Sequence, residues 1–139
     1  MESILIDAGP LIALFNKRDR FHPQSIAFLK GFQGRLYTTW PVITEAFRML
    51  DFNVNAQINL LQWIHRGGLT LFPLGESHIQ RLIGLCEKYD DVPMDLADAS
   101  LIVAAENKGI TKIASIDSDF CIYRDVRNRY LTNVFYGEH

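Results

Sequence analysis

The feature that most constrains the fold is a regular alternation of short β-favouring runs with longer segments of helical character. The β-favouring runs lie at 3–6, 36–39, 69–74, 112–116 and 131–136. The helical segments lie at 11–15, 22–32, 40–50, 53–66, 76–89 and 95–108. Strands that alternate with helices pack as a mostly parallel central sheet with helices on both faces, a three-layer α/β sandwich. Because 139 residues suffice for one such core, we expect a single domain over 1–139.

The composition argues against several other classes of protein. The longest apolar runs, 11–15 and 101–105, are far shorter than the roughly 20 residues that span a bilayer, so we expect no membrane segment. Glu2 stands where a secretory signal carries positive charge, which favours a cytoplasmic protein. Cys86 and Cys121 have no metal-binding spacing and are expected to be reduced, structural and buried.

Positive charge is grouped in two places, although the net charge is −2 and by itself gives no sign of nucleic-acid binding. Lys17, Arg18 and Arg20 form one group, and three arginines at 124, 127 and 129 form the other. Each group either contacts RNA phosphates or is an ordinary solvated loop. The four histidines show no metal-binding spacing, so surface or packing roles are expected for them.

Acidic residues occur where predicted strands end and where predicted helices begin. Asp7 follows the first strand and Asp117 follows the fourth, while Glu45, Asp95 and Asp98 lie in the opening turns of helices. In open α/β sheets the ligand crevice lies beyond the carboxyl ends of the strands. We therefore expect four or five carboxylates to meet in one pocket.

Gathered carboxylates repel one another and lose water, which destabilises a fold unless a cation neutralises them. A donor set of Asp and Glu oxygens suits a hard ion better than it suits zinc. Mg²⁺ is the expected ion, and Mn²⁺ is a substitute for it. Magnesium in such sites commonly serves phosphate chemistry. The acids therefore favour a metal-dependent enzyme acting on phosphate esters.

Four short motifs in this order and spacing resemble a known family. They are Ile-Asp-Ala-Gly-Pro-Leu at 6–11, Thr-Glu at 44–45, Met-Asp-Leu-Ala-Asp-Ala at 94–99 and Ser-Ile-Asp-Ser-Asp-Phe at 115–120. Together they resemble the PIN-domain nucleases, and within them the VapC-type toxin ribonucleases of bacterial and archaeal toxin–antitoxin pairs. The resemblance covers nearly the whole chain.

The resemblance implies a PIN-like fold and assigns roles to four acids. Asp7 and Asp98 would be the principal Mg²⁺ ligands, and Glu45 and Asp117 would complete the acidic quartet directly or through water. The implied reaction is hydrolysis of RNA phosphodiester bonds by metal-activated water. A homodimer and a cognate antitoxin that blocks the site are implied as partners. Gly9 stands where many relatives carry Ser, Thr or Asn.

Two further acids are secondary candidates for the site. Asp95 lies three residues before Asp98, which is also the spacing of a helix N-cap, so it is either a cap or a site residue. Asp119 is either a site residue or a turn residue that bonds nearby backbone.

Other functions remain as alternatives. A dehalogenase-like phosphatase would need a second Asp two residues after the first, where Gly9 stands, and a receiver domain would need an acidic pair near the first strand. From another class, a catalytically silent PIN-fold module would bind RNA or a protein without cutting. Retention of all four acids argues against the silent module.

Overall fold

The structure, a computed structural model, describes residues 2–92, 94–116, 123 and 131–136. Within them the chain forms a five-stranded sheet in the order β3-β2-β1-β4-β5, and every strand pairing is parallel. The strands are β1 (Glu2–Ile6), β2 (Gly34–Thr38), β3 (Thr70–Leu71), β4 (Lys112–Ala114) and β5 (Thr132–Asn133). The parallel α/β sheet expected from the sequence is confirmed.

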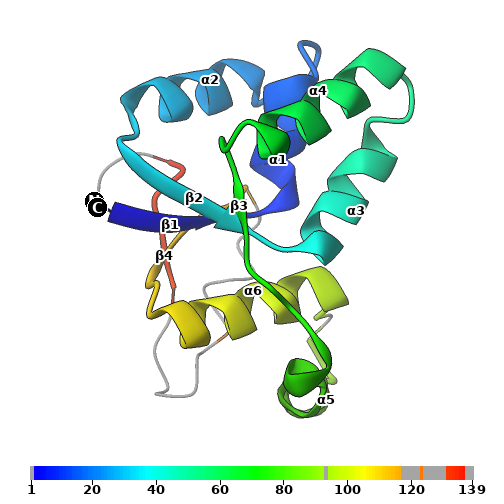
Figure 1. Cartoon of the computed structure of the whole chain (residues 1–139), viewed down its shortest axis with the longest axis vertical. Helices are drawn as coiled ribbons and strands as arrows, with labels where there is room; N and C mark the ends of the chain where they lie inside the picture. The colour runs from blue at the N-terminus through cyan, green and yellow to red at the C-terminus, as the bar shows by residue number, and fades with distance from the viewer. Residues whose placement is uncertain (1, 93, 117–122, 124–130, 137–139) are drawn as a thin grey trace.

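Helices cover both faces of this sheet. They are α1 (Ala8–Phe15), α2 (His22–Gly31), α3 (Trp40–Met49), α4 (Val54–His65), α5 (Ile79–Lys88) and α6 (Leu96–Lys108). Figure 1 shows α1, α2 and α4 on one side of the sheet and α5 and α6 on the other. The three-layer arrangement is therefore confirmed as well. Among the described residues, no helix has the length and apolar character needed to cross a membrane.

The two edge strands are shorter than expected. The run at 69–74 pairs with β2 only over β3. The Phe72 N–H still donates to the Thr38 carbonyl at 2.9 Å, but the next N–H on that side, of Leu74, donates to the Phe72 carbonyl instead. The run at 131–136 pairs only over β5, and beyond the ladder the Asn133 side chain hydrogen-bonds the backbone of Ser115. Its Nδ2 donates to the Ser115 carbonyl at 2.8 Å, and its Oδ1 accepts from the Ser115 N–H at 3.2 Å. The helix expected over 76–89 begins as a 3-10 turn, Glu76–His78, before α5.

The centre of the core is α6. Ala97 and every residue over 99–105 are buried, and four of these are alanines, whose small side chains let the helix pack closely. Asp95 caps the start of α6, and Gly109 ends it in the left-handed conformation, with φ at 66°. Because α6 is fixed at both ends and buried along its length, the residues of its first turn have a defined position.

Candidate active site

The candidate site lies at the point where the strand order of the sheet reverses. From the central β1, the chain builds β2 and β3 on one side and β4 and β5 on the other. Crevices form beyond the carboxyl ends of strands at such a switch point. Asp7 and Ser115 follow the two strands that flank it, and the Asp7 N–H extends their ladder by donating to the Ala114 carbonyl at 3.0 Å.

Asp7 is a buried carboxylate with both oxygens engaged. Its side chain is 7% exposed, and it is the N-cap of α1. Oδ1 accepts from the Ala8 N–H at 2.7 Å, and Oδ2 accepts from the Ser115 hydroxyl at 3.1 Å. Burial raises the pKa of Asp7 to about 6, although the two hydrogen bonds lower it, and the charges of Glu45 and Asp95 raise it further.

Asp98 lies in the first turn of α6 and has the more strongly perturbed carboxyl group. Burial, followed by the charges of Asp95 and Asp7, raises its pKa to about 8. Two contacts act in the opposite direction: the Tyr123 hydroxyl donates to Oδ2 at 3.3 Å, and the backbone of Asp95 hydrogen-bonds the Asp98 carboxyl group. A half-buried acid with this pKa is typical of a functional site.

Asp95 acts as a cap and also belongs to the cluster. Its Oδ1 accepts from the Asp98 N–H at 2.8 Å, which is the capping geometry that the spacing allowed. Its charge nevertheless raises the pKa of both Asp7 and Asp98. Asp95 is exposed, so its carboxylate can reach solvent at the mouth of the site.

Buried hydroxyl groups join the elements that carry the acids. The Thr39 and Ser100 hydroxyls share a hydrogen bond of 2.5 Å between α3 and α6, and Ser100 Oγ also donates to the Ala97 carbonyl at 2.7 Å. Thr38 Oγ1 donates to the Ile6 carbonyl at 2.9 Å, next to Asp7. These bonds fix the starts of α3 and α6 relative to the end of β1.

The charges of four predicted acids, from three parts of the chain, act on one another. Half-buried Glu45 on α3 lies close enough to Asp7 to raise its pKa, and Asp95 and Asp98 complete the cluster. Over 2–92, 94–116, 123 and 131–136, no three His, Cys, Asp or Glu side chains form a group that could hold a metal ion. Asp117 and Asp119 lie outside the described residues.

Tyr123 was not identified from the sequence, yet it contacts the site. Its side chain is fully buried, its hydroxyl bonds Asp98, and its ring meets the Tyr89 ring edge-on with centroids 5.1 Å apart. No local motif marks this tyrosine, because its partner lies 25 residues earlier in the chain. Ser115 belongs to the motif at 115–120, but its bond to Asp7 spans 108 residues, so no local pattern predicts that bond.

Other predicted features are placed as follows. Cys86 is a free thiol but is exposed, which corrects the expectation of a buried filler. Cys121 and the arginines at 124, 127 and 129 fall outside the described residues. His22 Nδ1 bonds the Ala13 carbonyl at 2.7 Å, and His78 Nδ1 accepts from the Gly75 N–H at 3.0 Å, so both have structural contacts.

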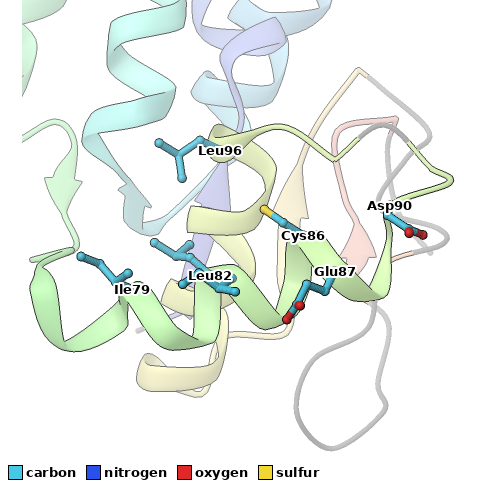
Figure 2. A pocket seen from close by; sticks show the side chains of 7 residues that line it. Ile79, Leu82, Cys86, Glu87, Asp90 and Leu96 are labelled. Carbon is cyan, nitrogen blue, oxygen red and sulfur yellow. The ribbon is translucent and has the colours of Figure 1, made fainter.

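An apolar hollow runs along α5 and reaches Leu96 at the start of α6, and we call it the α5 hollow. It has a volume of about 740 Å³. Figure 2 shows Ile79, Leu82, Cys86 and Leu96 around it, with Glu87 and Asp90 at one end. Ile79, Leu96 and the neighbouring Ile83 are about half exposed, which is high for large apolar side chains.

The candidate site is thus a set of carboxylates whose charges act on one another at the switch point of a parallel α/β sheet. The chain belongs to the PIN domain family, whose profile matches residues 4–126. Among solved structures, the chain is similar to VapC20 of Mycobacterium tuberculosis, described as a toxin that cleaves the sarcin–ricin loop. The TM-score is 0.76 at 17% identity, over 85% of this chain and 92% of that one. No curated protein sequence matches.

Proposed function

We propose that this chain is a magnesium-dependent endoribonuclease and the VapC-type toxin of a type II toxin–antitoxin pair. The observation that carries the proposal is that the charges of Glu45 and Asp95 act on Asp7, and those of Asp95 and Asp7 act on Asp98, at the switch point of a PIN domain. The structural likeness to a toxin that cleaves RNA supports the same reaction class. With this activity we expect the chain to act in the cytoplasm, where its RNA substrate lies.

The donor set fits a hard divalent cation. Asp7 and Asp98 are both deprived of water, and the charge of Asp7 adds to the electrostatic cost of ionising Asp98; a bound cation would offset these costs. In the proposal Asp7 and Asp98 hold Mg²⁺, Glu45 and Asp117 complete its shell, and Mn²⁺ is a substitute. When bound, the ion supplies Lewis acidity and a water of lowered pKa.

The chain's own residues orient these acids and receive the substrate. The Ala8 N–H and the Ser115 hydroxyl hold the two oxygens of Asp7, and the Tyr123 hydroxyl holds one oxygen of Asp98. Contacts of this kind to metal ligands fix their orientation. The N-terminus of α1 begins directly after Asp7, and its partial positive charge favours a phosphate at the same edge.

The test is cleavage of RNA by the purified chain and its Asp98→Asn variant. We expect cleavage with Mg²⁺ or Mn²⁺, none after chelation, and a loss of at least about 100-fold in Asp98→Asn, because a principal metal ligand is removed. Asp91→Asn, an exposed acid on the loop before α6, is the matched control and should retain full activity. Urea unfolding of each variant checks that the fold is intact.

Three outcomes would contradict the proposal. Cleavage that survives Asp98→Asn would indicate another site or a contaminating nuclease. Cleavage that survives chelation would exclude metal-dependent chemistry. Binding of RNA without cleavage by the wild type would instead identify the catalytically silent PIN-fold module.

A homodimer and a cognate antitoxin are part of the proposal. The α5 hollow supports a protein partner, because exposed apolar side chains that cluster on one helix are typical of interaction surfaces. We expect light scattering to give twice the chain mass, and Ile83→Asp to give the monomer if α5 forms the contact.

Expression of the chain alone should slow bacterial growth, and coexpression of the small protein encoded beside it should relieve the effect. Harmless expression at high level would count against the toxin, while leaving the nuclease chemistry to the cleavage assay.

A further inference from the structure

A second groove lies at the other end of α1 from the acids. It has a volume of about 530 Å³ and is formed by the end of α1 with the loop after it, and by the turn between α3 and α4 with the start of α4. We call it the α1–α4 groove. Its lining includes Lys17, Arg18 and Phe52, so it contains two of the three residues of the first basic group. None of these residues belongs to the acidic cluster.

The charged groups of this groove are available to a ligand. Lys17 and Arg18 are exposed, and in the described part of the chain neither forms an ion pair. Two cations side by side on a rigid surface suit phosphates, which a nucleic acid backbone presents at regular spacing. The groove therefore has the charge of a polyanion site, although the chain as a whole is slightly acidic.

The same groove offers groups that recognise bases. Phe52 is 59% exposed, which is unusual for a phenylalanine, and its ring is open to stacking. Asn55 and Asn59 lie four residues apart on α4, so their exposed amides share one face of the helix and can bond base edges. Cations, an exposed ring and amides together are the features of a single-stranded RNA site rather than of a simple anion site.

A protein segment fits this groove less well. Helical peptides that dock on a protein bury an apolar face in an apolar groove, as the α5 hollow would allow. The lining of the α1–α4 groove is instead mainly amide and cationic. RNA is therefore the occupant that the groove chemistry favours.

The groove and the acids are joined by two packed helices. Figure 1 shows α1 running from the end of β1 toward α4. α1 begins after Asp7 and ends at Phe15, and it packs against α3, which carries Glu45 and leads into Phe52. Eight helical residues span about 12 Å, and nucleotides stacked as in one strand of a duplex rise about 3.4 Å each. Three or four nucleotides therefore cover the distance.

We propose that the α1–α4 groove binds single-stranded RNA three or four nucleotides from the bond that is cut. This inference rests on the proposed ribonuclease function and adds a substrate-binding subsite to it. The groove contributes affinity, and the acids contribute the chemistry.

The first test measures binding of a fluorescein-labelled 12-mer of uridylate by anisotropy, with Asp98→Asn as background and EDTA present. Loss of two phosphate contacts in Lys17→Ala/Arg18→Ala should weaken binding about 20-fold at 0.1 M salt, and should lower the slope of log K against log salt by about 1.4. Phe52→Leu should weaken binding at least about fivefold through lost stacking. Lys30→Ala/Arg35→Ala removes two exposed charges elsewhere and is the matched control.

The second test varies substrate length in the active enzyme. With RNA extending six nucleotides to either side of the cut, Lys17→Ala/Arg18→Ala should raise KM about 20-fold and leave kcat unchanged. With RNA extending only two nucleotides to either side, the variant and the wild type should have the same KM, since this short substrate does not reach the groove.

The outcomes separate this inference from the proposed function. Equal RNA affinity in all variants would overturn the subsite while leaving cleavage intact. A polyglutamate 12-mer that binds as tightly as RNA, with no effect of Phe52→Leu, would show an acidic protein segment as the occupant and would also overturn it. If the wild type cleaves no RNA, the ribonuclease proposal fails, and the anisotropy assay still decides whether the groove binds RNA.

Discussion

Asp7→Asn tests whether the buried carboxylate destabilises the fold when no cation is present. The pKa of Asp7 is raised from 3.8 to about 6, mainly by burial. At about 1.4 kcal/mol for each pH unit, ionised Asp7 costs the folded state about 3 kcal/mol. Asn is nearly the same size, and its amide oxygen can still accept from the Ala8 N–H that Asp7 caps.

The sign of the pH dependence follows from the state, folded or unfolded, in which Asp7 binds its proton more tightly. Because the pKa is higher in the folded state, Asp7 favours folding fully below about pH 4, and this contribution is lost as the pH rises through about 6. Metal-free wild type should therefore lose about 3 kcal/mol of unfolding free energy between pH 4 and pH 7.5 through this residue. Asp98, with a pKa of about 8, adds to the loss in the same direction.

Urea unfolding followed by circular dichroism in EDTA measures the effect. Relative to wild type, the unfolding free energy of Asp7→Asn should improve by about 3 kcal/mol from pH 4 to pH 7.5. Exposed Asp91→Asn is the control and should parallel the wild type. Added Mg²⁺ should stabilise the wild type at pH 7.5 more than it stabilises Asp7→Asn. Equal pH dependence in Asp7→Asn and wild type would refute the assignment of this cost to Asp7.

Two further predictions follow from single contacts. Tyr123→Phe removes the hydroxyl that orients Asp98. In RNA cleavage, kcat should therefore be about tenfold lower and Mg²⁺ binding weaker, while KM is unchanged. A similar loss of kcat in the buried control Tyr37→Phe would contradict a positioning role for Tyr123. Gly34→Ala should cost about 2 kcal/mol or more in urea unfolding, because φ is +157° and the new Cβ would overlap a β1 carbonyl oxygen. Gly31→Ala meets nothing within 4 Å and should stay within about 1 kcal/mol of wild type; equal costs for the two glycines would disprove the clash.

The sheet and the acidic edge were predictable because their signals are local. A run such as 3–6 that stops at Asp7 marks both a strand and its carboxyl end, and the alternation with helices implies parallel pairing. The spacing of Asp95 and Asp98 left capping and site roles open, and the structure shows the cap together with electrostatic coupling to the cluster.

Other features could not be predicted, because they depend on contacts between distant parts of the chain. Tyr123 reaches Asp98 only after the fold brings them together, and the bond between Thr39 and Ser100 spans 61 residues. Strand length at the sheet edges depends on which backbone groups find a partner, which composition does not encode. The exposure of Cys86 likewise depends on which face of α5 meets α6, and its average tendency toward burial did not apply here.

The pairing of β1 with β4 has a consequence for synthesis. Ile6 pairs with Ala114, and the hydroxyl that holds Asp7 belongs to the next residue, Ser115. A ribosome must therefore release the chain well past its first hundred residues before the acidic edge is assembled. Growing chains should be inert for most of their translation, and fragments cut anywhere between these strands should regain the site only by reassociating.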